Sequence, residues 1–407
     1  DDICSDMKSN KKMFRLLQGD VGSGKTIISA LAIANAIDSG YQAAMMVPTE
    51  ILAQQHYKYF KEIFSKYKIN TVLLTGKLTI KEKNEIYIKI KNKTVDLVVG
   101  THSLYNKNIK FSSLGLTVID EQHKFGVNQR LSLQSKSPNC HVLIMSATPI
   151  PRSLTFAVYG EIDISVIREK PKGRKEIKTT VISNKKIIEL YRGIGRKVTN
   201  NEKVFWVVPE IGKIGGNIED QDINKESILT RYSSLEKLFG NKVSFVHGKM
   251  KKSEINEKIE LFKNDNIMIL IATTVIEVGI DIPKASLIVI ENANNFGLAQ
   301  LHQLRGRIGR GKLQADCVLV HNNNLSANGK SRLLIMKESN DGFLIAEQDL
   351  LLRGGGEIFG TKQTGLPTWK FFNPFYDMDL LNDAKKNSLK LLSSKENQQN
   401  QVDFLTK

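Results

Sequence analysis

Residues 14–26, FRLLQGDVGSGKT, decide the fold of this chain. Phe14–Gln18 has the apolar character of a buried strand, and the residues after it fit the pattern GxxxxGK[ST] of a phosphate-binding loop that leads into a helix. In such a loop, glycines let backbone N–H groups surround a phosphate, Lys25 neutralises the β/γ oxygens, and the Thr26 hydroxyl reaches Mg²⁺. The alternative is a Gly-rich turn that matches the pattern by accident. The candidate nucleotide-binding residues are Gly19, Asp20, Val21, Gly22, Ser23, Gly24, Lys25 and Thr26.

Short apolar, β-branched segments alternate with helical ones along the chain, as in parallel sheets joined by crossover helices. Their nearly continuous Val, Ile and Leu content is typical of strands covered on both faces. Residues 50–67 carry apolar side chains at helical spacing and predict an amphipathic helix. The expected strands are Phe14–Gln18, Tyr41–Val47, Thr71–Leu74, Val95–Val99, Leu116–Ile119 and His141–Met145 in a first sheet, and Lys178–Ile182, Val204–Val208, Val243–Val246, Ile267–Ala272, Ser286–Glu291 and Ala315–Val320 in a second. The predicted fold class is α/β, with two parallel sheets in tandem.

The stretch REKPKGRKEIK at 168–178 is charged and aperiodic, and it predicts a linker between the two sheets. Two short helices, Lys330–Glu338 and Gly342–Leu351, are expected after the second sheet, followed by a Gly-rich loop from Arg353 to Gly365. The expected organisation is a nucleotide-binding domain over 1–168, a second sheet domain over 169–325, and a C-terminal helical hairpin with loop and tail over 326–407.

Composition excludes several classes of protein. No apolar run approaches the roughly 18 residues that a membrane-spanning helix needs. The three cysteines, Cys4, Cys140 and Cys317, lie too far apart in sequence to indicate a zinc site or a disulfide framework. We therefore expect a cytoplasmic protein without contact to membranes. The excess of 59 Lys and Arg over 42 Asp and Glu, a formal charge of +17, fits a surface for a polyanion or, equally, the Lys- and Asn-rich composition of an A+T-rich genome.

Two adjacent carboxylates, Asp120 and Glu121, follow the strand Leu116–Ile119. Because neighbouring side chains at a strand end point in different directions, Asp120 can hold a water of the Mg²⁺ shell while Glu121 polarises the water that attacks the γ-phosphate. Taken alone, the pair is more often an N-cap of the next helix. The phosphate loop earlier in the chain favours the catalytic interpretation.

Three of the 13 arginines, Arg305, Arg307 and Arg310, lie within six residues. A guanidinium offers a fork of five donors and keeps its charge, which suits phosphate. Arg307 and Arg310 are three apart and would share one face of a helix. If the second domain closes against the first, both could reach the γ-phosphate as arginine fingers. The alternative is a basic surface helix.

These motifs occur in the order found in superfamily-2 helicases, which the chain resembles over nearly its whole length. Longer stretches, among them DEQHKFGVNQR at 120–130 and AEQDLLLRGGGEIFGTKQTG at 346–365, are similar to the RecG family of ATP-dependent DNA helicases, which act on stalled forks and branched DNA. The motif residues are the phosphate loop at 19–26, Pro48-Thr49-Glu50, Gly100-Thr101-His102, Asp120–His123, Ser146-Ala147-Thr148, His247-Gly248, Ala272-Thr273-Thr274 with Glu277, Gly279 and Asp281, and Gln303–Arg310.

The resemblance implies two RecA-like domains that clamp Mg-ATP and a motor that moves on duplex DNA with 3′-to-5′ helicase polarity. It adds Gln303 to the catalytic residues and Gly279 and Asp281 to the nucleotide site. It also implies that Ser146, Thr148, Arg353, Glu357 and Gln363 couple hydrolysis to movement, and that Thr49, Glu50, Thr75, Gly76, Thr101, His247 and Thr274 lie near the nucleic-acid backbone. Such contacts would be independent of base sequence and sensitive to salt. For any single hydroxyl, a local cap or turn role is equally open.

Members of that family carry an N-terminal wedge domain, whereas this chain opens at Asp1 shortly before the phosphate loop. We therefore expect a fragment, a split gene product or a decayed copy, monomeric and nucleoid-associated, that binds forks, Holliday junctions and duplex DNA, with a separate polypeptide able to supply the wedge. Two departures from the family pattern are Gly355 in place of Pro and Asn294-Asn295 in place of an acidic–basic pair. One alternative function is a transcription-repair coupling translocase, but such proteins usually have Glu where this chain has Gln122. The other is a non-catalytic DNA-binding remnant.

Overall fold

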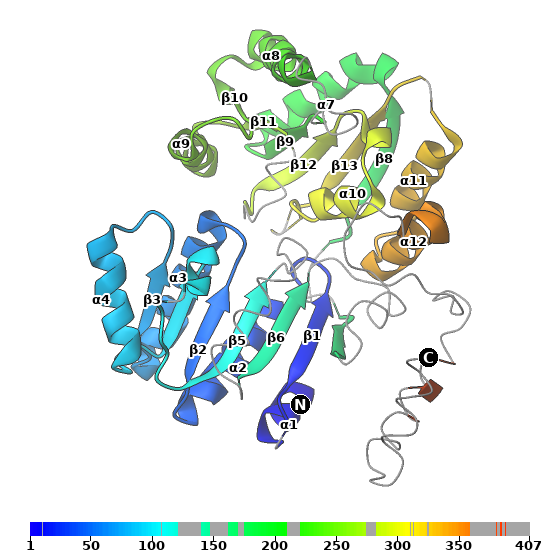
Figure 1. Ribbon diagram of the computed structural model, residues 1–407. Coiled ribbons are helices and arrows are strands. Elements are labelled where there is room, and N and C mark those ends of the chain that lie inside the picture. Colours follow the sequence, from blue (N-terminus) through cyan, green and yellow to red (C-terminus); the bar gives the residue numbers. More distant parts are fainter. Residues whose placement is uncertain are drawn as a thin grey trace.

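The computed structural model of the chain places two parallel β-sheets one above the other, each covered by helices (Figure 1). The lower sheet comes from the N-terminal part of the chain, and the upper sheet follows it. The residues that the structure describes are 1–9, 11–106, 108–120, 140–146, 162–169, 175–209, 220–273, 282–309, 311, 313–323, 325–358, 380, 383, 384 and 387. The α/β fold class expected from the sequence is confirmed.

The first sheet has the strand order β3-β4-β2-β5-β6-β1-β7, and its strands pair in parallel. The six strands expected from the sequence are present, with ends shifted by one or two residues. The seventh, β7, was not predicted, because it is a half-exposed edge strand without a continuous apolar run. The strands are β1 (Phe14–Gly19), β2 (Gln42–Met46), β3 (Thr71–Leu74), β4 (Leu97–Gly100), β5 (Leu114–Asp120), β6 (His141–Ser146) and β7 (Asp163–Ile167).

Helices cover both faces of this sheet. Helices α1 (Asp2–Lys8), α2 (Lys25–Asp38) and α3 (Glu50–Phe64) pack on one face, and α4 (Ile80–Lys91) packs on the other. Short 3₁₀ turns, η1 (Ser65–Tyr67) and η2 (His102–Tyr105), follow α3 and β4. The predicted helix over 50–67 is confirmed as α3 plus η1. Its Phe60 is fully buried, which contributes about 1.5–3 kcal/mol of transfer free energy.

The second sheet has the strand order β10-β11-β9-β12-β13-β8, again with parallel pairs. All six expected strands are present. They are β8 (Lys178–Ser183), β9 (Lys203–Val207), β10 (Val243–Val246), β11 (Ile269–Ala272), β12 (Ala285–Ile290) and β13 (Asp316–His321). Part of the predicted linker, 168–169 and 175–177, is described and contains neither helix nor strand, whereas 170–174 lie outside the described residues.

The alternation of side chains along β9 shows how this domain is built. Trp206 packs towards α7 (Ile187–Thr199) and α8 (Asp220–Phe239), while its neighbour Phe205 packs towards α9 (Lys252–Lys263) and α10 (Leu298–Arg305) on the opposite face. Because successive strand residues face opposite sides, a run of apolar residues fills two cores at once. The described part of this domain also contains the 3₁₀ turns η4 (Asn184–Lys186), η5 (Gly240–Lys242) and η7 (Ala293–Asn295).

Two helices, α11 (Ala327–Glu338) and α12 (Gly342–Ile358), pack against each other and against α10, on the right of the upper domain in Figure 1. Both were expected, but the Gly-rich loop predicted from Arg353 is wrong over 353–358, where α12 continues. Glycine lowers helix stability by about 1 kcal/mol per residue, so three consecutive glycines suggested a break. Propensity alone does not end a helix whose earlier turns are anchored by tertiary packing. The rest of the predicted loop lies outside the described residues.

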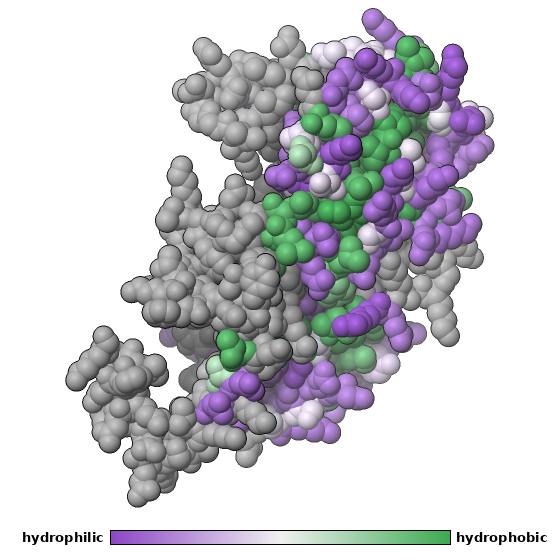
Figure 2. Space-filling model, turned by 90° about the vertical axis from the view of Figure 1, so that its right-hand side faces the viewer, coloured by the Kyte–Doolittle hydropathy of each residue, from purple (hydrophilic) through white to green (hydrophobic). Residues whose placement is uncertain are grey.

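Figure 2 shows the side of the molecule that lies on the right in Figure 1, where hydrophobic surface of the upper domain is bordered by hydrophilic residues. A groove of about 510 Å³ lies between α7 and the β13–β8 edge of the second sheet, with Ile182, Leu190 and Val318 in its lining. It includes Lys178 and Asp316, at the amino ends of their strands. None of the described helices has both the length and the apolar character needed to span a membrane.

Candidate active site

The carboxyl ends of three adjacent strands bring the motifs of the first domain together. Strands β5, β6 and β1 are neighbours, with Asp120 paired in register to Met145 and Gln18 paired to Ser146. The phosphate loop, Asp120 and Ser146 therefore lie together at the carboxyl ends of these strands. Parallel sheets bind their ligands at this end.

The phosphate loop needs its glycines at defined positions. Gly22 and Gly24 have φ angles of 78° and 96°, in the left-handed region that favours glycine. A Cβ atom at Gly19 would lie 2.3 Å from the Ser23 hydroxyl oxygen and 3.2 Å from Ile167 Cβ, so a side chain here would displace its neighbours. Gly24 then caps α2, which starts at Lys25 and directs the positive end of its dipole at the loop.

Lys25 closes the mouth of this loop. Its Nζ donates to the carbonyl oxygens of Gly19 at 2.8 Å and Asp20 at 2.9 Å, and the side chain is 9% exposed. Thr26 follows in the first turn of α2. The expected order of strand, loop and helix is present, and the glycine cradle, the helix N-terminus and the ammonium are suited to phosphate groups.

Asp120 has a partner that the sequence did not reveal. His56 of α3 places its Nε2 3.2 Å from Asp120 Oδ2, with the two side chains 11% and 14% exposed. Carboxylate and hydroxyl oxygens, such as those of Asp120 and Thr26, are of the kind that Mg²⁺ prefers as ligands. Among the described residues, no cluster of three or more His, Cys, Asp or Glu could hold a metal by itself. Glu121 lies outside the described residues.

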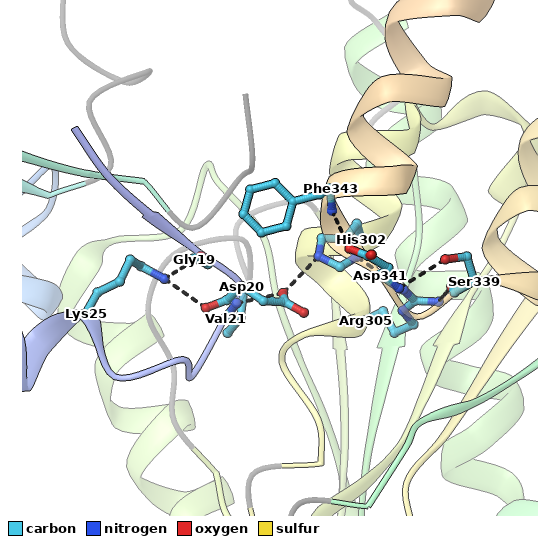
Figure 3. A network of polar contacts seen from close by, with 9 residues as sticks. All are labelled: Gly19, Asp20, Val21, Lys25, His302, Arg305, Ser339, Asp341 and Phe343. Carbon is cyan, nitrogen blue, oxygen red and sulfur yellow. Dashed lines mark hydrogen bonds and ion pairs between the residues drawn. The ribbon is translucent and has the colours of Figure 1, made fainter. Parts of the chain in front are cut away.

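The phosphate loop touches the second domain directly (Figure 3). His302 of α10 places its Nε2 2.9 Å from Asp20 Oδ1. A Cβ atom at Gly306, just after α10, would lie 2.9 Å from Val21 Cγ2, so the backbone here packs tightly on the loop. Residues 282 positions apart thus meet at the nucleotide site.

Arg305, the first residue of the arginine cluster, has a structural role. Arg305 is 2% exposed, and its Nη1 donates to the carbonyl oxygens of Met336 at 2.9 Å and Ser339 at 2.8 Å. It therefore anchors α10 to the end of α11. Burial lowers the pKa of this guanidinium, which stays charged at neutral pH because arginine titrates far above it.

Helix α10 ends at Arg305, so the predicted helical face shared by Arg307 and Arg310 is wrong for Arg307. Arg307 lies in the turn that follows, where its N–H donates to the Leu304 carbonyl oxygen at 3.0 Å. The turn forms because Gly306 and Gly309, with φ of 71° at Gly309, end the helix. Arg307 is buried next to the contact between Gly306 and Val21. Arg310 lies outside the described residues.

A cleft of about 510 Å³ separates the two domains on another side of the interface. Four of the residues expected near DNA, namely Thr49, Glu50, Gly76 and Thr101, line it. The neighbours of His247 line it from the second domain, and the His247 ring stacks on Phe245. Thr75 is buried beside Gly76, and Thr49 also caps α3 by accepting from Leu52 N–H at 3.4 Å.

The floor of the cleft is mostly apolar. Ile51 of α3 packs against the core of the second domain, and Met250, Ile255 and Ile259 line the opposite wall. Glu50 also lines the cleft, and its carboxylate lies 3.6 Å from the ammonium of Lys77. The cleft thus combines polar residues from the ends of strands and helices with an apolar contact between domains.

The remaining predicted site residues are only partly described. Gln303 lies buried on α10, one residue from His302. The backbone of Arg353 and Glu357 lies in α12. The residues Thr148, Thr274, Gly279, Asp281 and Gln363 lie outside the described part of the chain.

His56 and His302 are the residues that sequence reasoning missed. For His302 a signal was present, because a histidine three residues before an arginine shares its helical face. For His56 the amphipathic pattern over residues 50–67 gave no such signal. Neither motif pattern shows that these rings contact aspartates 64 and 282 residues away.

Comparisons with known proteins match both sheet domains to helicases. The chain matches the family models "DEAD/DEAH box helicase" over residues 2–156 and "Helicase conserved C-terminal domain" over residues 185–312. It is 43% identical over 387 residues to the ATP-dependent DNA helicase RecG of Streptococcus pneumoniae, and 44% identical over 387 residues to that of Thermotoga maritima. These alignments cover 95% of this chain but 56% and 49% of the relatives. The chain spans about half the length of the curated relatives it matches.

Solved structures give the same picture. A RecG structure bound to a three-way DNA junction has a TM-score of 0.75 and 42% identity, over 93% of this chain and 49% of that one. Dbp5 of S. cerevisiae bound to RNA and ADP BeF3 has a TM-score of 0.61 at 18% identity, over 85% of this chain and 90% of that one. The second likeness shows the fold alone. Together they confirm the expected helicase fold of two RecA-like domains.

Proposed function

The chain belongs to the RecG family of ATP-dependent DNA helicases, and from this membership we propose that its 407 residues form an ATP-driven motor for branched DNA. The contact between the phosphate loop and α10 carries the proposal. It joins the two domains through Asp20 and His302 at the place where a nucleotide would bind. Hydrolysis at this joint can therefore change how the domains sit on DNA.

The predicted motif residues have proposed parts in hydrolysis. The loop amides and Lys25 bind the β- and γ-phosphates, and Thr26 and Asp120 hold Mg²⁺. Bound Mg-ATP supplies the phosphoryl group and the electrophilic centre. Glu121 orients the attacking water, and Arg307, Arg310 and Gln303 stabilise charge from the second domain. Gly279 and Asp281 complete the nucleotide site, and Ser146 and Thr148 couple hydrolysis to closure.

Nucleic acid is proposed to lie along the interdomain cleft. Thr49, Glu50, Gly76 and Thr101 line it, and Thr75, His247 and Thr274 belong to the same set of motifs. The relative in the junction structure is bound to three-way DNA, and we extend forks, Holliday junctions and duplex DNA to this chain. The charge of +17 supports binding to a polyanion.

Further parts of the proposal concern assembly. We propose that the motor acts as a monomer with 3′-to-5′ helicase polarity, that a separate wedge polypeptide can work with it, and that it associates with the nucleoid. The proposed domain boundaries are 1–168, 169–325 and 326–407. Arg353, Glu357 and Gln363 are proposed to couple ATP hydrolysis to translocation.

ATP turnover with and without branched DNA tests the proposal. Lys25→Ala removes a phosphate counter-charge and Glu121→Gln removes the water-orienting carboxylate, so each should lower kcat by about 10²–10³, as the loss of an oxyanion-stabilising group does. Glu121→Gln should still bind ATP. Lys91→Ala, on the exposed side of α4, is the matched control and should behave like the wild type. Turnover within a few-fold of wild type in both active-site variants would refute the assignment.

A further inference from the structure

His302 connects two groups that are otherwise unrelated in the fold. On one side its Nε2 lies 2.9 Å from Asp20 Oδ1 in the phosphate loop. On the other its Nδ1 lies 3.2 Å from Nη2 of Arg305. The histidine side chain is 6% exposed and that of Asp20 is 20% exposed, so the bridge is shielded from solvent.

The neighbour of each ring nitrogen determines where the His302 proton sits. Arginine has only donors, so the Arg305 guanidinium must donate to Nδ1, which leaves that nitrogen as an acceptor. The ring proton then resides on Nε2 and is donated to the Asp20 carboxylate. A hydrogen bond to a carboxylate is stronger than one between neutral groups, so the bond ties the loop firmly to α10.

The anchoring of Arg305 makes this bond a relay between domains. The Arg305 guanidinium donates to the carbonyl oxygen of Ser339 (Figure 3) and to that of Met336, shortly before α12 begins at Gly342. His302 is therefore fixed from the side of the second domain. Any displacement of Asp20 along with the phosphate loop is transmitted to a ring that cannot turn away.

The contact between His302 and Asp20 also affects where Arg307 lies. Gly306 packs on Val21 of the loop, and Arg307 is the next residue. The distance of Arg307 from a bound nucleotide is thus set by how α10 sits on the loop. The Asp20–His302 bond is a polar contact between the loop and α10 and helps to set this distance.

We propose that His302 is a positioning residue for the motor reaction: it holds α10 against the phosphate loop through Asp20, so that Arg307 meets the γ-phosphate. The inference rests on the proposed ATP hydrolysis. His302 touches neither nucleotide nor DNA in this role. Replacing His302 should therefore change kcat more than ATP binding, because Arg307 stabilises the transition state only when the two domains are in contact.

Two substitutions of His302 distinguish its hydrogen bond with Asp20 from its hydrogen bond with Arg305. The amide nitrogen of glutamine reaches about as far as His Nε2, so His302→Gln keeps a donor for Asp20. Asparagine is shorter, so His302→Asn keeps an acceptor for Arg305 and loses the bond to Asp20. The pair therefore tests the loop contact while leaving the joint with α11 intact.

Steady-state ATP turnover at saturating duplex DNA is the first measurement. His302→Asn should lower kcat by about tenfold or more, as the loss of a hydrogen bond to a charged group does, while the KM for ATP stays within about threefold because the effect lies in the transition state. His302→Gln should restore kcat to within about threefold of wild type. Equal kcat in all three proteins, or equal loss in both variants, would overturn the inference.

A second measurement does not depend on hydrolysis. Spin labels at Lys66→Cys in the first domain and Lys237→Cys in the second, both exposed positions, report the distance between domains in a Cys4→Ser background. His302→Asn should broaden the distance distribution, and His302→Gln should keep that of the parent. An unchanged distribution in His302→Asn would overturn the inference. Absence of turnover in the wild type would instead refute the proposed function, and the distance measurement would still decide on His302.

Discussion

Replacing Arg305 by methionine separates a structural arginine from a catalytic one. The sequence placed this residue in a cluster suited to phosphate, whereas its guanidinium is buried and directed at the end of α11. Methionine has a similar length and no donor. The substitution therefore leaves the space largely filled and removes the hydrogen bonds together with the charge of the guanidinium.

The size of the effect follows from the acceptors that lose their donor. They are the carbonyl oxygens of Met336 and Ser339 at 2.9 and 2.8 Å, the Thr179 hydroxyl at 3.3 Å and His302 Nδ1 at 3.2 Å. A buried acceptor left unsatisfied costs about 1–3 kcal/mol, and the two carbonyl bonds are the shortest. We expect a loss of about 3 kcal/mol in the free energy of unfolding, a large part of a total that is typically about 5–15 kcal/mol.

Urea denaturation followed by Trp206 fluorescence measures this loss. Trp206 is fully buried in the second domain, and Trp369→Phe removes the other tryptophan of the chain. With a urea slope of about 1–3 kcal/mol per molar, the midpoint of the second domain should fall by about 1 M or more. Arg192→Met, at an exposed position of α7, is the matched control and should change stability by less than about 0.5 kcal/mol.

An unchanged midpoint in Arg305→Met would refute the reasoning. If the same variant then bound duplex DNA more weakly, with a shallower dependence on salt, Arg305 would be a phosphate ligand instead.

Three further predictions concern the motor. Arg307→Ala and Arg310→Ala should each lower kcat by about 10³, the contribution of an arginine finger, with little change in nucleotide affinity by equilibrium titration; normal turnover in both would make them DNA contacts. Gln363→Ala should keep DNA-stimulated ATP hydrolysis and lose translocation in a triplex-displacement assay, and equal loss of both would indicate a folding role. The 407 residues alone should bind linear and forked duplexes with affinities within a few-fold, falling steeply with salt because phosphate contacts dominate; strong fork preference with efficient unwinding would show that these domains recognise the junction.

Much of the fold follows from local patterns in the sequence. The run of apolar residues in β9, with Phe205 and Trp206 on opposite faces, is readable because a strand buried on both sides needs apolar residues at every position. The edge strand β7 cannot be predicted in this way, since it pairs only with β1 among the described strands and its residues are partly exposed. The sequence therefore predicted the strands whose residues are buried on both faces of the sheet, and missed the partly exposed one.

The continuation of α12 through Gly354 to Ile358 shows where local propensity fails. Glycines disfavour helix by entropy, and the sequence therefore predicted a loop. The packing of α12 on α10 and α11 anchors the helix before the glycines are reached. Helix ends depend on such contacts between distant segments, which no local pattern contains.

The sequence by itself determined the chemistry of the nucleotide site. The spacing of Gly19, Gly24 and Lys25 requires a loop with left-handed turns and a helix N-terminus, and these features are encoded within eight consecutive residues. Tertiary structure alone decided the partners of these groups. Asp20 contacts His302 because the two domains pack against each other. Arg305, which the sequence suggested for phosphate binding, donates instead to carbonyl oxygens at the end of α11. Contacts between residues hundreds of positions apart arise from packing, for which a single sequence carries no periodic signal.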